Sequence, residues 1–219
     1  MSDINQKAAN DTDRIVLDLK MTLLSDTIFG NGMSIPGEED ISVLTDAQGF
    51  PYYKGSTFKG IFREETERYI LWTERTGSID VPSLFGESTP GSSDKVSESR
   101  RLVFSDFVMS PHVRKVLLDE IGDDTGKVLD CLSNIRAFTR ISEDGTAAQG
   151  SLRYARCINQ GIVFYSTLSC SRADLSLVKE ILPLVKWIGT LRNRGFGKVL
   201  IEIEDIGNSN SPEIGGDGT

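Results

Sequence analysis

The sequence predicts an α+β fold whose elements follow one another in the order β-α-β-β-α-β. Four short segments have the patterns of strands, and two longer segments repeat their apolar residues at helical spacing. The chain has 219 residues, of which 38% are hydrophobic. This length suits one elaborated domain with a sizeable core.

The first half of the chain supplies a strand and a helix. In Arg14–Leu24 every second residue from Ile15 to Leu23 is apolar, which is the pattern of a half-buried strand. From Ser56 to about Arg75, apolar residues recur near helical spacing between charged ones, and the pattern ends at a glycine. We therefore expect the first helix in this segment.

The second half supplies the other four elements. Residues 102–109 and 161–169 are predicted to be strands, which could pair antiparallel. Residues 173–191 carry one apolar stripe and predict a helix with a kink at Pro183, and residues 198–205 close the series as a strand. This order is that of ferredoxin-like and RRM-like folds.

Long insertions interrupt this simple order and predict functional loops. We expect one domain over 14–205, a flexible N-terminus before it and a flexible acidic tail after it. Disorder is expected in 87–99, and two helices are expected inside the last insertion. The corresponding ranges are the N-terminus 1–13, insertions at about 25–55, 77–100 and 110–158, the helices 113–121 and 127–135, and the tail 206–219.

Composition restricts the compartment and the partners. No apolar run could span a bilayer and the N-terminus lacks the core of a signal peptide, so we expect a cytoplasmic protein with no membrane partner. The three cysteines are widely separated, which indicates buried thiols rather than a disulfide framework or a structural zinc site. The net charge of -8 argues against a free-standing nucleic-acid binder.

Two basic segments oppose this objection. Before the first predicted helix, Lys54, Gly55 and Ser56 precede Lys59 and Arg63. With Ser56 as N-cap, the free amides of the first turn would hold a phosphate; the alternative is an ordinary capped helix with solvated lysines.

The second basic segment joins the last helix to the last strand. Residues 187–199 contain Arg192, Arg194 and Lys198 between glycines and hold no acid, whereas residues 200–219 hold five acids and no base. One face could therefore bind RNA while others stay acidic. Such a groove could be completed by neighbouring copies of the chain.

Four motifs in order carry a resemblance to a known family. They are Gly-Ser-Thr-Phe-Lys-Gly at 55–60, Leu-Phe-Gly at 84–86, Arg-Leu-Val-Phe-Ser-Asp at 101–106 and Arg-Gly-Phe-Gly-Lys-Val at 194–199. Together they resemble the RAMP superfamily of CRISPR-associated proteins over residues 14–205. Within it, the chain is most similar to the backbone subunit of type III effector complexes.

The resemblance implies a subunit that polymerises along a guide CRISPR RNA and cuts the paired target RNA at regular intervals. Its partners would be guide RNA, target RNA, copies of itself and other effector subunits. Insertions would form a thumb and a lid, and 110–158 is the candidate thumb, with Arg140 and Arg153 as residues that could steer RNA. Base pairing would read the sequence, so the protein would recognise only backbone and geometry.

The resemblance also places Asp40 at the position of the catalytic aspartate. A divalent cation, Mg²⁺ or Mn²⁺, is implied, and Asp40 could bind it with help from Glu38 or Glu39. Without the resemblance, this acidic run would be interpreted as a solvated loop.

Two rival functions stay open. One is a non-catalytic RNA-binding or capping subunit of the same complex, in which replacing Asp40 changes nothing. The other is a stand-alone endoribonuclease that processes precursor guide RNA without metal. His112 is the only histidine, which counts against that second rival because a two-histidine mechanism is impossible within one chain.

Overall fold

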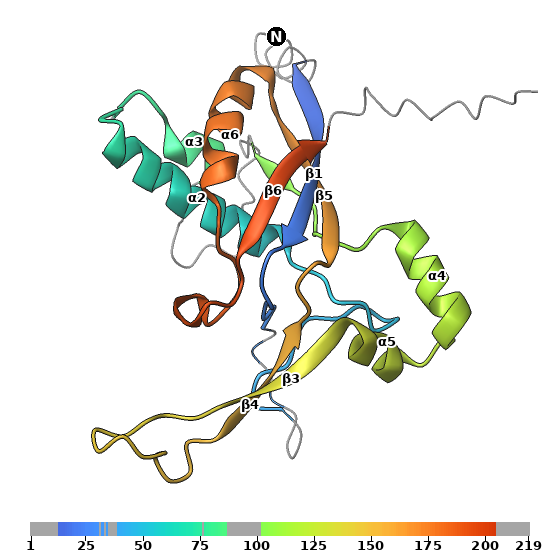
Figure 1. The fold of residues 1–219 in the computed structure, drawn as a ribbon. Helices are drawn as coiled ribbons and strands as arrows, with labels where there is room; N and C mark the ends of the chain where they lie inside the picture. The colour runs from blue at the N-terminus through green and yellow to red at the C-terminus, as the bar shows by residue number, and fades with distance from the viewer. Residues whose placement is uncertain are drawn as a thin grey trace, which may run out of the picture.

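The computed structural model describes residues 13–30, 32, 34, 39–75, 77–86 and 102–204. Its centre is a four-stranded sheet in the order β2-β5-β1-β6, in which all neighbours are antiparallel (Figure 1). The strands are β1 (Arg14–Leu23), β2 (Val103–Phe104), β5 (Val163–Ser171) and β6 (Val199–Glu204). With α2 (Gly55–Trp72) and α6 (Leu175–Ile181), they confirm the predicted β-α-β-β-α-β core.

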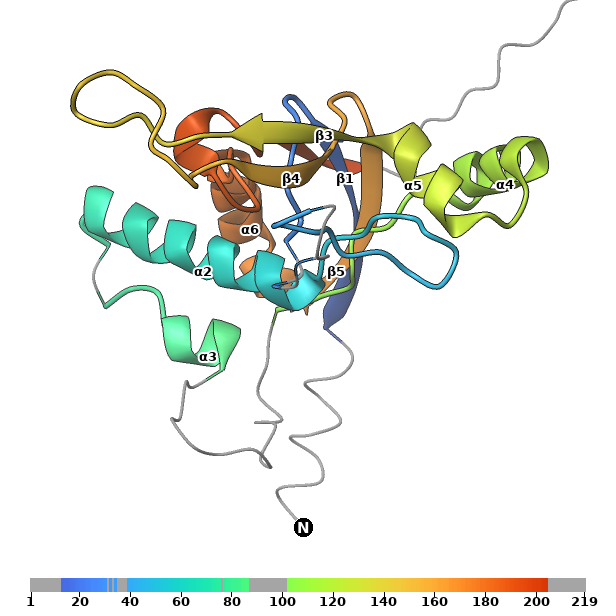
Figure 2. The ribbon, with the colours of Figure 1, turned by 90° about the horizontal axis from the view of Figure 1, so that it is seen from below.

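The core lies between the sheet and the two helices that cover one of its faces (Figures 1 and 2). Alternation places Leu19, Met21 and Leu23 of β1 on this covered face, where each is at most 1% exposed. From α2, Phe58 packs its ring 4.7 Å from that of Phe107, between ring centroids. The predicted alternating strand and the predicted helical stripe therefore meet in one aromatic core.

The second core strand is shorter than the predicted 102–109, because a bulge interrupts it. The four steps from Phe104 to Val108 lie opposite only three steps of β5, from Leu168 to Tyr165. At this bulge Phe107 pairs with Tyr53, just before α2. The interruption therefore links the sheet to the start of the helix.

The predicted helix 173–191 is wrong over its second half. The structure has a 3₁₀ turn at Arg172–Asp174, the helix α6, and a second 3₁₀ turn at Leu182–Leu184. Pro183 lacks an amide proton and its ring clashes with the preceding turn, so it ends the helix rather than kinking it. Trp187 then forms a β-bridge with Lys198 instead of a helical turn.

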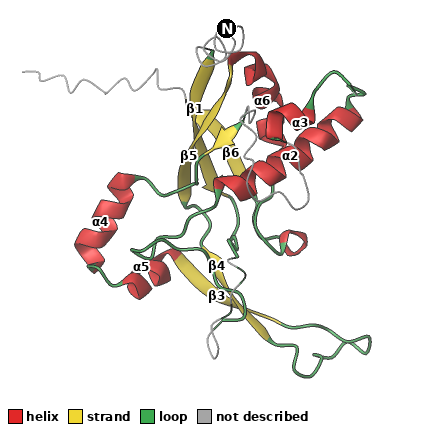
Figure 3. Cartoon of the chain, turned by 180° about the vertical axis from the view of Figure 1, so that it is seen from behind, coloured by secondary structure: helices red, strands yellow, loops and turns green. Residues whose placement is uncertain are grey.

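The insertion between β2 and β5 forms a separate hairpin and two helices. The helices are α4 (Pro111–Ile121) and α5 (Thr125–Leu132); the strands are β3 (Ser133–Phe138) and β4 (Arg153–Ile158). The hairpin lies beyond one end of the main sheet, and α4 projects beside it (Figure 3). The predicted helix 113–121 is confirmed, whereas 127–135 is wrong at its end, because Ser133–Ile135 already pair with β4.

A few further expectations can be compared with the structure. In the 77–100 insertion, α3 (Val81–Phe85) is helical. The expected disorder in 87–99 and in the two termini lies outside the described residues. Cys157 and Cys170 are buried as predicted, but Cys131 is exposed on α5, so the prediction of a buried thiol was wrong there. None of the helices in the described ranges is long and apolar enough to cross a membrane.

Candidate nucleic-acid interface

A cleft of about 580 Å³ lies between the β3–β4 hairpin and residues 192–198 before β6, which are called the glycine-rich loop below. Arg140, Arg153 and Arg194 line it, and all three side chains are exposed. Ile41 and Leu191 also line this cleft. The structure therefore brings together three of the arginines predicted to bind RNA, although they are far apart in the sequence.

One aromatic contact joins the two walls of the cleft. Phe138 at the end of β3 packs edge-on against Phe196 of the glycine-rich loop, with ring centroids 5.4 Å apart. Phe196 follows a 3₁₀ turn at Arg192–Arg194, which begins after Leu191 in the left-handed conformation. This contact holds the loop against the hairpin, and Arg194 lines the cleft together with the two hairpin arginines.

Asp40 lies beside this cleft on a short segment that runs parallel to β4. Its amide donates to the carbonyl of Tyr154 at 2.8 Å, and its Oδ2 accepts from the amide of Tyr154 at 2.8 Å. Its Oδ1 lies 3.9 Å from Nε of Arg153. The Asp40 carboxylate is exposed and lies next to Arg153, which lines the cleft. A phosphate bound by Arg153 would therefore lie close to Asp40.

The neighbouring acid, Glu39, has a different environment. It is 3% exposed and forms an ion pair with Nε of Arg156, which also contacts Asp130 at 2.6 Å. Arg156 therefore already pairs with the Glu39 carboxylate, and this pairing opposes the expected help of Glu39 in binding a cation, which stays a prediction. Glu38 lies outside the described residues.

The described residues do not by themselves complete a site for Mg²⁺ or Mn²⁺. Such ions take about six oxygen ligands, usually a few carboxylates with water and phosphate oxygens. Across 13–30, 39–75, 77–86 and 102–204, no group of three acidic, histidine or cysteine side chains could hold a metal ion. Asp40 offers one carboxylate, and one of its oxygens already accepts an amide proton.

The start of α2 differs from the predicted phosphate-binding turn. The N-cap is Lys54 rather than Ser56, and no side chain of the cap residue bonds the first turn. Instead, Oδ1 of Asp106 accepts from the amide of Gly55 at 2.8 Å. A Cβ at Gly55 would lie 2.4 Å from the carbonyl oxygen of Ser105, so only glycine allows this close approach.

The remaining predicted RNA-binding residues do not line the cleft. Lys54 and Ser56 are exposed at the start of α2, whereas Lys59 lies over the ring of Phe85 and Arg63 pairs with Glu67 at 2.9 Å. Arg192 and Lys198 lie exposed at the two ends of the glycine-rich loop.

Tyr53 connects the start of α2 to the glycine-rich loop. Burial raises the pKa of its phenol, while a hydrogen bond with the backbone of Gly189 and the charge of Arg192 act against this rise. The phenol therefore stays neutral at physiological pH. Tyr53 directly precedes Lys54 and contacts Gly189, three residues before Arg192, so Lys54 and Arg192 lie on neighbouring segments.

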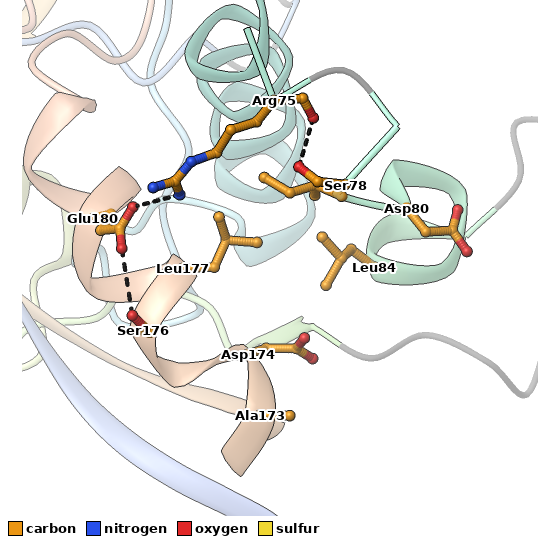
Figure 4. A pocket seen from close by; sticks show the side chains of 10 residues that line it. Arg75, Ser78, Asp80, Leu84, Ala173, Asp174, Ser176, Leu177 and Glu180 are labelled. Carbon is orange, nitrogen blue, oxygen red and sulfur yellow. Dashed lines mark hydrogen bonds and ion pairs between the residues drawn. The ribbon is translucent and has the colours of Figure 1, made fainter. Parts of the chain in front are cut away.

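A second cavity, of about 550 Å³, lies on the helical side between α2, α3 and α6 (Figure 4). Three carboxylates line it, from Asp80, Asp174 and Glu180. Arg75 donates to Glu180 at 3.1 Å. Hydrogen bonds from the Tyr69 hydroxyl and from Arg75 hold the pKa of Glu180 below its ordinary value. The excess of acid makes this cavity unsuited to RNA phosphates.

Sequence reasoning missed some residues that shape the interface. Asp106 belongs to the motif at 101–106, but its contact with Gly55 spans 51 positions and no local pattern signals it. Phe138 and Phe196 are also far apart in sequence, and their pairing depends on how the hairpin folds back.

The structure thus combines an RRM-like core with an arginine-lined cleft beside an inserted hairpin, and comparison with known families agrees with the fold. The model of the RAMP superfamily matches residues 20–200. The chain therefore belongs to the RAMP superfamily, as the four motifs predicted.

Two solved structures show the same fold. A chain of a type III-B Cmr-beta complex bound to cognate target RNA has 13% identity and a TM-score of 0.61, over 86% of this chain and 97% of that one. A chain of the Cmr-beta complex in its apo state has a TM-score of 0.59 at the same identity and coverage. No curated protein matches this sequence.

Proposed function

We propose that this chain is a backbone subunit of a type III CRISPR effector complex, which binds guide RNA and cleaves the paired target RNA. Membership of the RAMP superfamily and the fold shared with Cmr-beta subunits support the class. The observation that carries the proposal is the position of Asp40, next to Arg153 at the rim of a cleft with three arginines. Its partners would be copies of itself and other effector subunits, in the cytoplasm.

The proposed reaction is a transesterification within the RNA backbone. The 2′-oxygen of one nucleotide bonds to the adjacent phosphorus, and the bond from phosphorus to the 5′-oxygen of the next nucleotide breaks. The 2′-hydroxyl loses its proton and the leaving 5′-oxygen gains one, which gives a cyclic phosphate and a 5′-hydroxyl. Asp40 would accept or help remove the proton, and the cleft arginines would stabilise charge on the phosphate.

In this proposal a divalent cation would be held by Asp40 together with oxygen atoms of the bound RNA. When bound, Mg²⁺ or Mn²⁺ would neutralise charge on the phosphate, with Asp40 as one protein ligand. The basic residues at the start of α2 (Lys54, Gly55, Ser56, Lys59 and Arg63) and in the glycine-rich loop (Arg192, Arg194 and Lys198) would hold the guide backbone.

The test compares the guide-loaded complex containing wild-type chain with one containing Asp40→Ala. We expect regularly spaced products from a labelled complementary RNA, and a loss of roughly 100-fold or more in cleavage rate for Asp40→Ala. Chelator should stop cleavage, and target binding should persist in both cases. Cleavage that is indifferent to Asp40 would reject the catalytic role.

One observation favours a non-catalytic RNA-binding or capping subunit as the second candidate. Oδ2 of Asp40 accepts the amide of Tyr154, so the carboxylate also holds its own segment against β4. A tether of this kind would be present in a subunit that binds RNA without cutting it. In that case Asp40→Asn, which keeps a hydrogen-bond acceptor, should leave both guide binding and any cleavage by the complex unchanged.

A further inference from the structure

The segment that carries Asp40 is attached to the hairpin rather than to the main sheet. Ile41 forms a parallel bridge with Ala155, and the amide of Arg156 donates to the carbonyl of Ile41 at 3.0 Å. Together with the Asp40–Tyr154 bonds, this isolated bridge holds residues 40–41 along the edge of β4. The position of the Asp40 carboxylate therefore depends on what holds this segment against β4.

A buried ion pair fixes this segment at the residue before Asp40. The side chain of Glu39 is 1% exposed and that of Arg156 is 12% exposed, so water screens their attraction little. Nη1 of Arg156 also donates to Oδ1 of Asp130 at 2.6 Å and to Oγ of Ser133 at 3.0 Å. One guanidinium thus joins the Asp40 segment to α5 and to the start of β3.

The pair has a cost that simple packing would avoid. The second carboxylate oxygen of Glu39, Oε2, is buried and has no hydrogen-bond partner in the structure. A buried ion pair is often no more stabilising than apolar residues of similar volume, whereas the loss of one partner is strongly destabilising. The ion pair does, however, have a specific geometric effect: the bond to Arg156 restricts the position of Glu39, and with it the position of the adjacent Asp40.

We propose that Glu39 and Arg156 are positioning residues for Asp40. Neither reaches the cleft; they set the register and depth of the segment on which the proposed catalytic carboxylate stands. This inference rests on the proposed function and names the device by which the hairpin determines the active geometry. Removing the pair should therefore slow cleavage without weakening the binding of RNA.

The experiment uses the assembled, guide-loaded complex at saturating target RNA. Glu39→Gln keeps the shape and one acceptor oxygen but removes the charge, and it should lower the single-turnover cleavage rate by roughly 100-fold, as small misplacements of reacting groups do. Target affinity should change less than about threefold. Arg156→Lys keeps the charge but loses the fork, and its rate should fall between wild type and Glu39→Gln.

A second measurement separates positioning from general loss of fold. Hydrogen exchange of the complex should be faster in the peptide containing residues 39–43 of the Glu39→Gln chain, while β1 and β5 keep their protection. Arg75→Gln, which removes an Arg–Glu pair on the opposite, helical side, is the matched control and should leave the cleavage rate unchanged.

The outcomes distinguish this inference from the function on which it rests. If Asp40→Ala abolishes cleavage while Glu39→Gln and Arg156→Lys cut at the wild-type rate, the positioning role is rejected and the catalytic role stands. If Asp40→Ala cuts normally, the catalytic role fails, and the positioning role fails with it. A parallel loss of affinity and of core protection in Glu39→Gln would also reject positioning, in favour of a purely structural pair.

Discussion

Two cavities of similar size lie in different parts of this molecule, one beside the hairpin and one among the helices, and their lining residues carry opposite charge. The cleft beside the hairpin, about 580 Å³, is lined by Arg140, Arg153 and Arg194. The cavity among α2, α3 and α6, about 550 Å³, is lined by Asp80, Asp174 and Glu180, with Arg75 as its one lining arginine. The two cavities therefore differ in charge rather than in volume, and only the charge of the hairpin cleft suits the proposed binding of RNA phosphates.

This difference bears on how a chain with a net charge of -8 could bind RNA, as the proposed function requires. Binding to a phosphate backbone depends on the charges near it, because salt screens charges more than about 8 to 10 Å away at physiological ionic strength. Acids on the helical side lower the net charge without facing the hairpin cleft. The total charge is thus a weak guide to function unless the fold shows where each sign lies.

The largest expected effect would come from reversing the charge of the cleft. Replacing Arg140, Arg153 and Arg194 together by Glu should weaken RNA binding by roughly 100- to 1000-fold at low salt, because three potential phosphate contacts become repulsive. The negative slope of log affinity against log salt concentration should become shallower by about 2 to 3, since each lost phosphate contact removes about 0.9. Titration of a fluorescent RNA with the chain at several salt concentrations measures both.

The matched control makes the same change in net charge on the helical side. Arg68, Arg75 and Lys179 are exposed on or next to α2 and α6, and their replacement by Glu should change the affinity by less than about threefold. Equal losses in the two triple variants would show that only total charge matters. The comparison between the two cavities would then have no functional meaning.

A smaller effect is expected from the backbone that shapes the cleft wall. Gly197 has a φ of +82°, and a Cβ there would lie 1.9 Å from the carbonyl oxygen of Ile188. Gly197→Ala should therefore lower the free energy of unfolding by about 2 to 4 kcal/mol, through strain and a displaced loop. Chemical denaturation of the isolated chain gives this value directly.

Gly195 provides the control, because it has a similar φ of +85° but open space where a Cβ would lie. Gly195→Ala should cost only about 1 to 2 kcal/mol, the penalty of the left-handed conformation alone. If both variants lost the same stability, close approach of the backbone would not be what requires glycine at Gly197.

The fold could be predicted because its signals are local and periodic. Alternation in β1 and the helical stripe of α2 each survive in the structure, since both elements bury one face against the same core. The helix after β5 was predicted too long because its apolar residues continue past Pro183. There the tertiary structure uses Val185 and Ile188 as buried extended chain rather than as helix.

The candidate site was predictable by residue type but not by arrangement. Arginines in the insertion and in the glycine-rich loop could be named from the sequence, yet their meeting at one cleft depends on the hairpin and on the Phe138–Phe196 contact. The predicted N-cap role of Ser56 was wrong: the N-cap is Lys54, and the carboxylate of Asp106, remote in sequence, accepts from the first amide of α2. The sequence named Asp40 as the catalytic candidate and Glu39 as a possible helper, and it gave no sign that Glu39 is buried while Asp40 is exposed.

The smallest expected effect concerns the attachment of the hairpin to the core. Asp26 follows β1 and accepts from Arg136 of β3 at 2.7 Å and from the amide of Gln160 at 3.1 Å. Partial burial pushes the pKa of Asp26 up, but these bonds and one from Asn134 outweigh it, so the pKa lies below its ordinary value of 3.8.

Because the pKa of Asp26 is lower in the folded chain than in the unfolded one, its charged form stabilises the fold above the ordinary value and loses this contribution as the pH falls through the folded pKa. The difference in free energy of unfolding between wild type and Asp26→Asn should therefore shrink as the pH is lowered from about 5 to about 3. Hydrogen exchange in β3 should show the same trend. The protection of α6, on the helical side, should be the same in wild type and Asp26→Asn at each pH. A stability difference that stays constant with pH would mean that Asp26 acts by packing. The charge of Asp26 would then play no part in attaching the hairpin to the core.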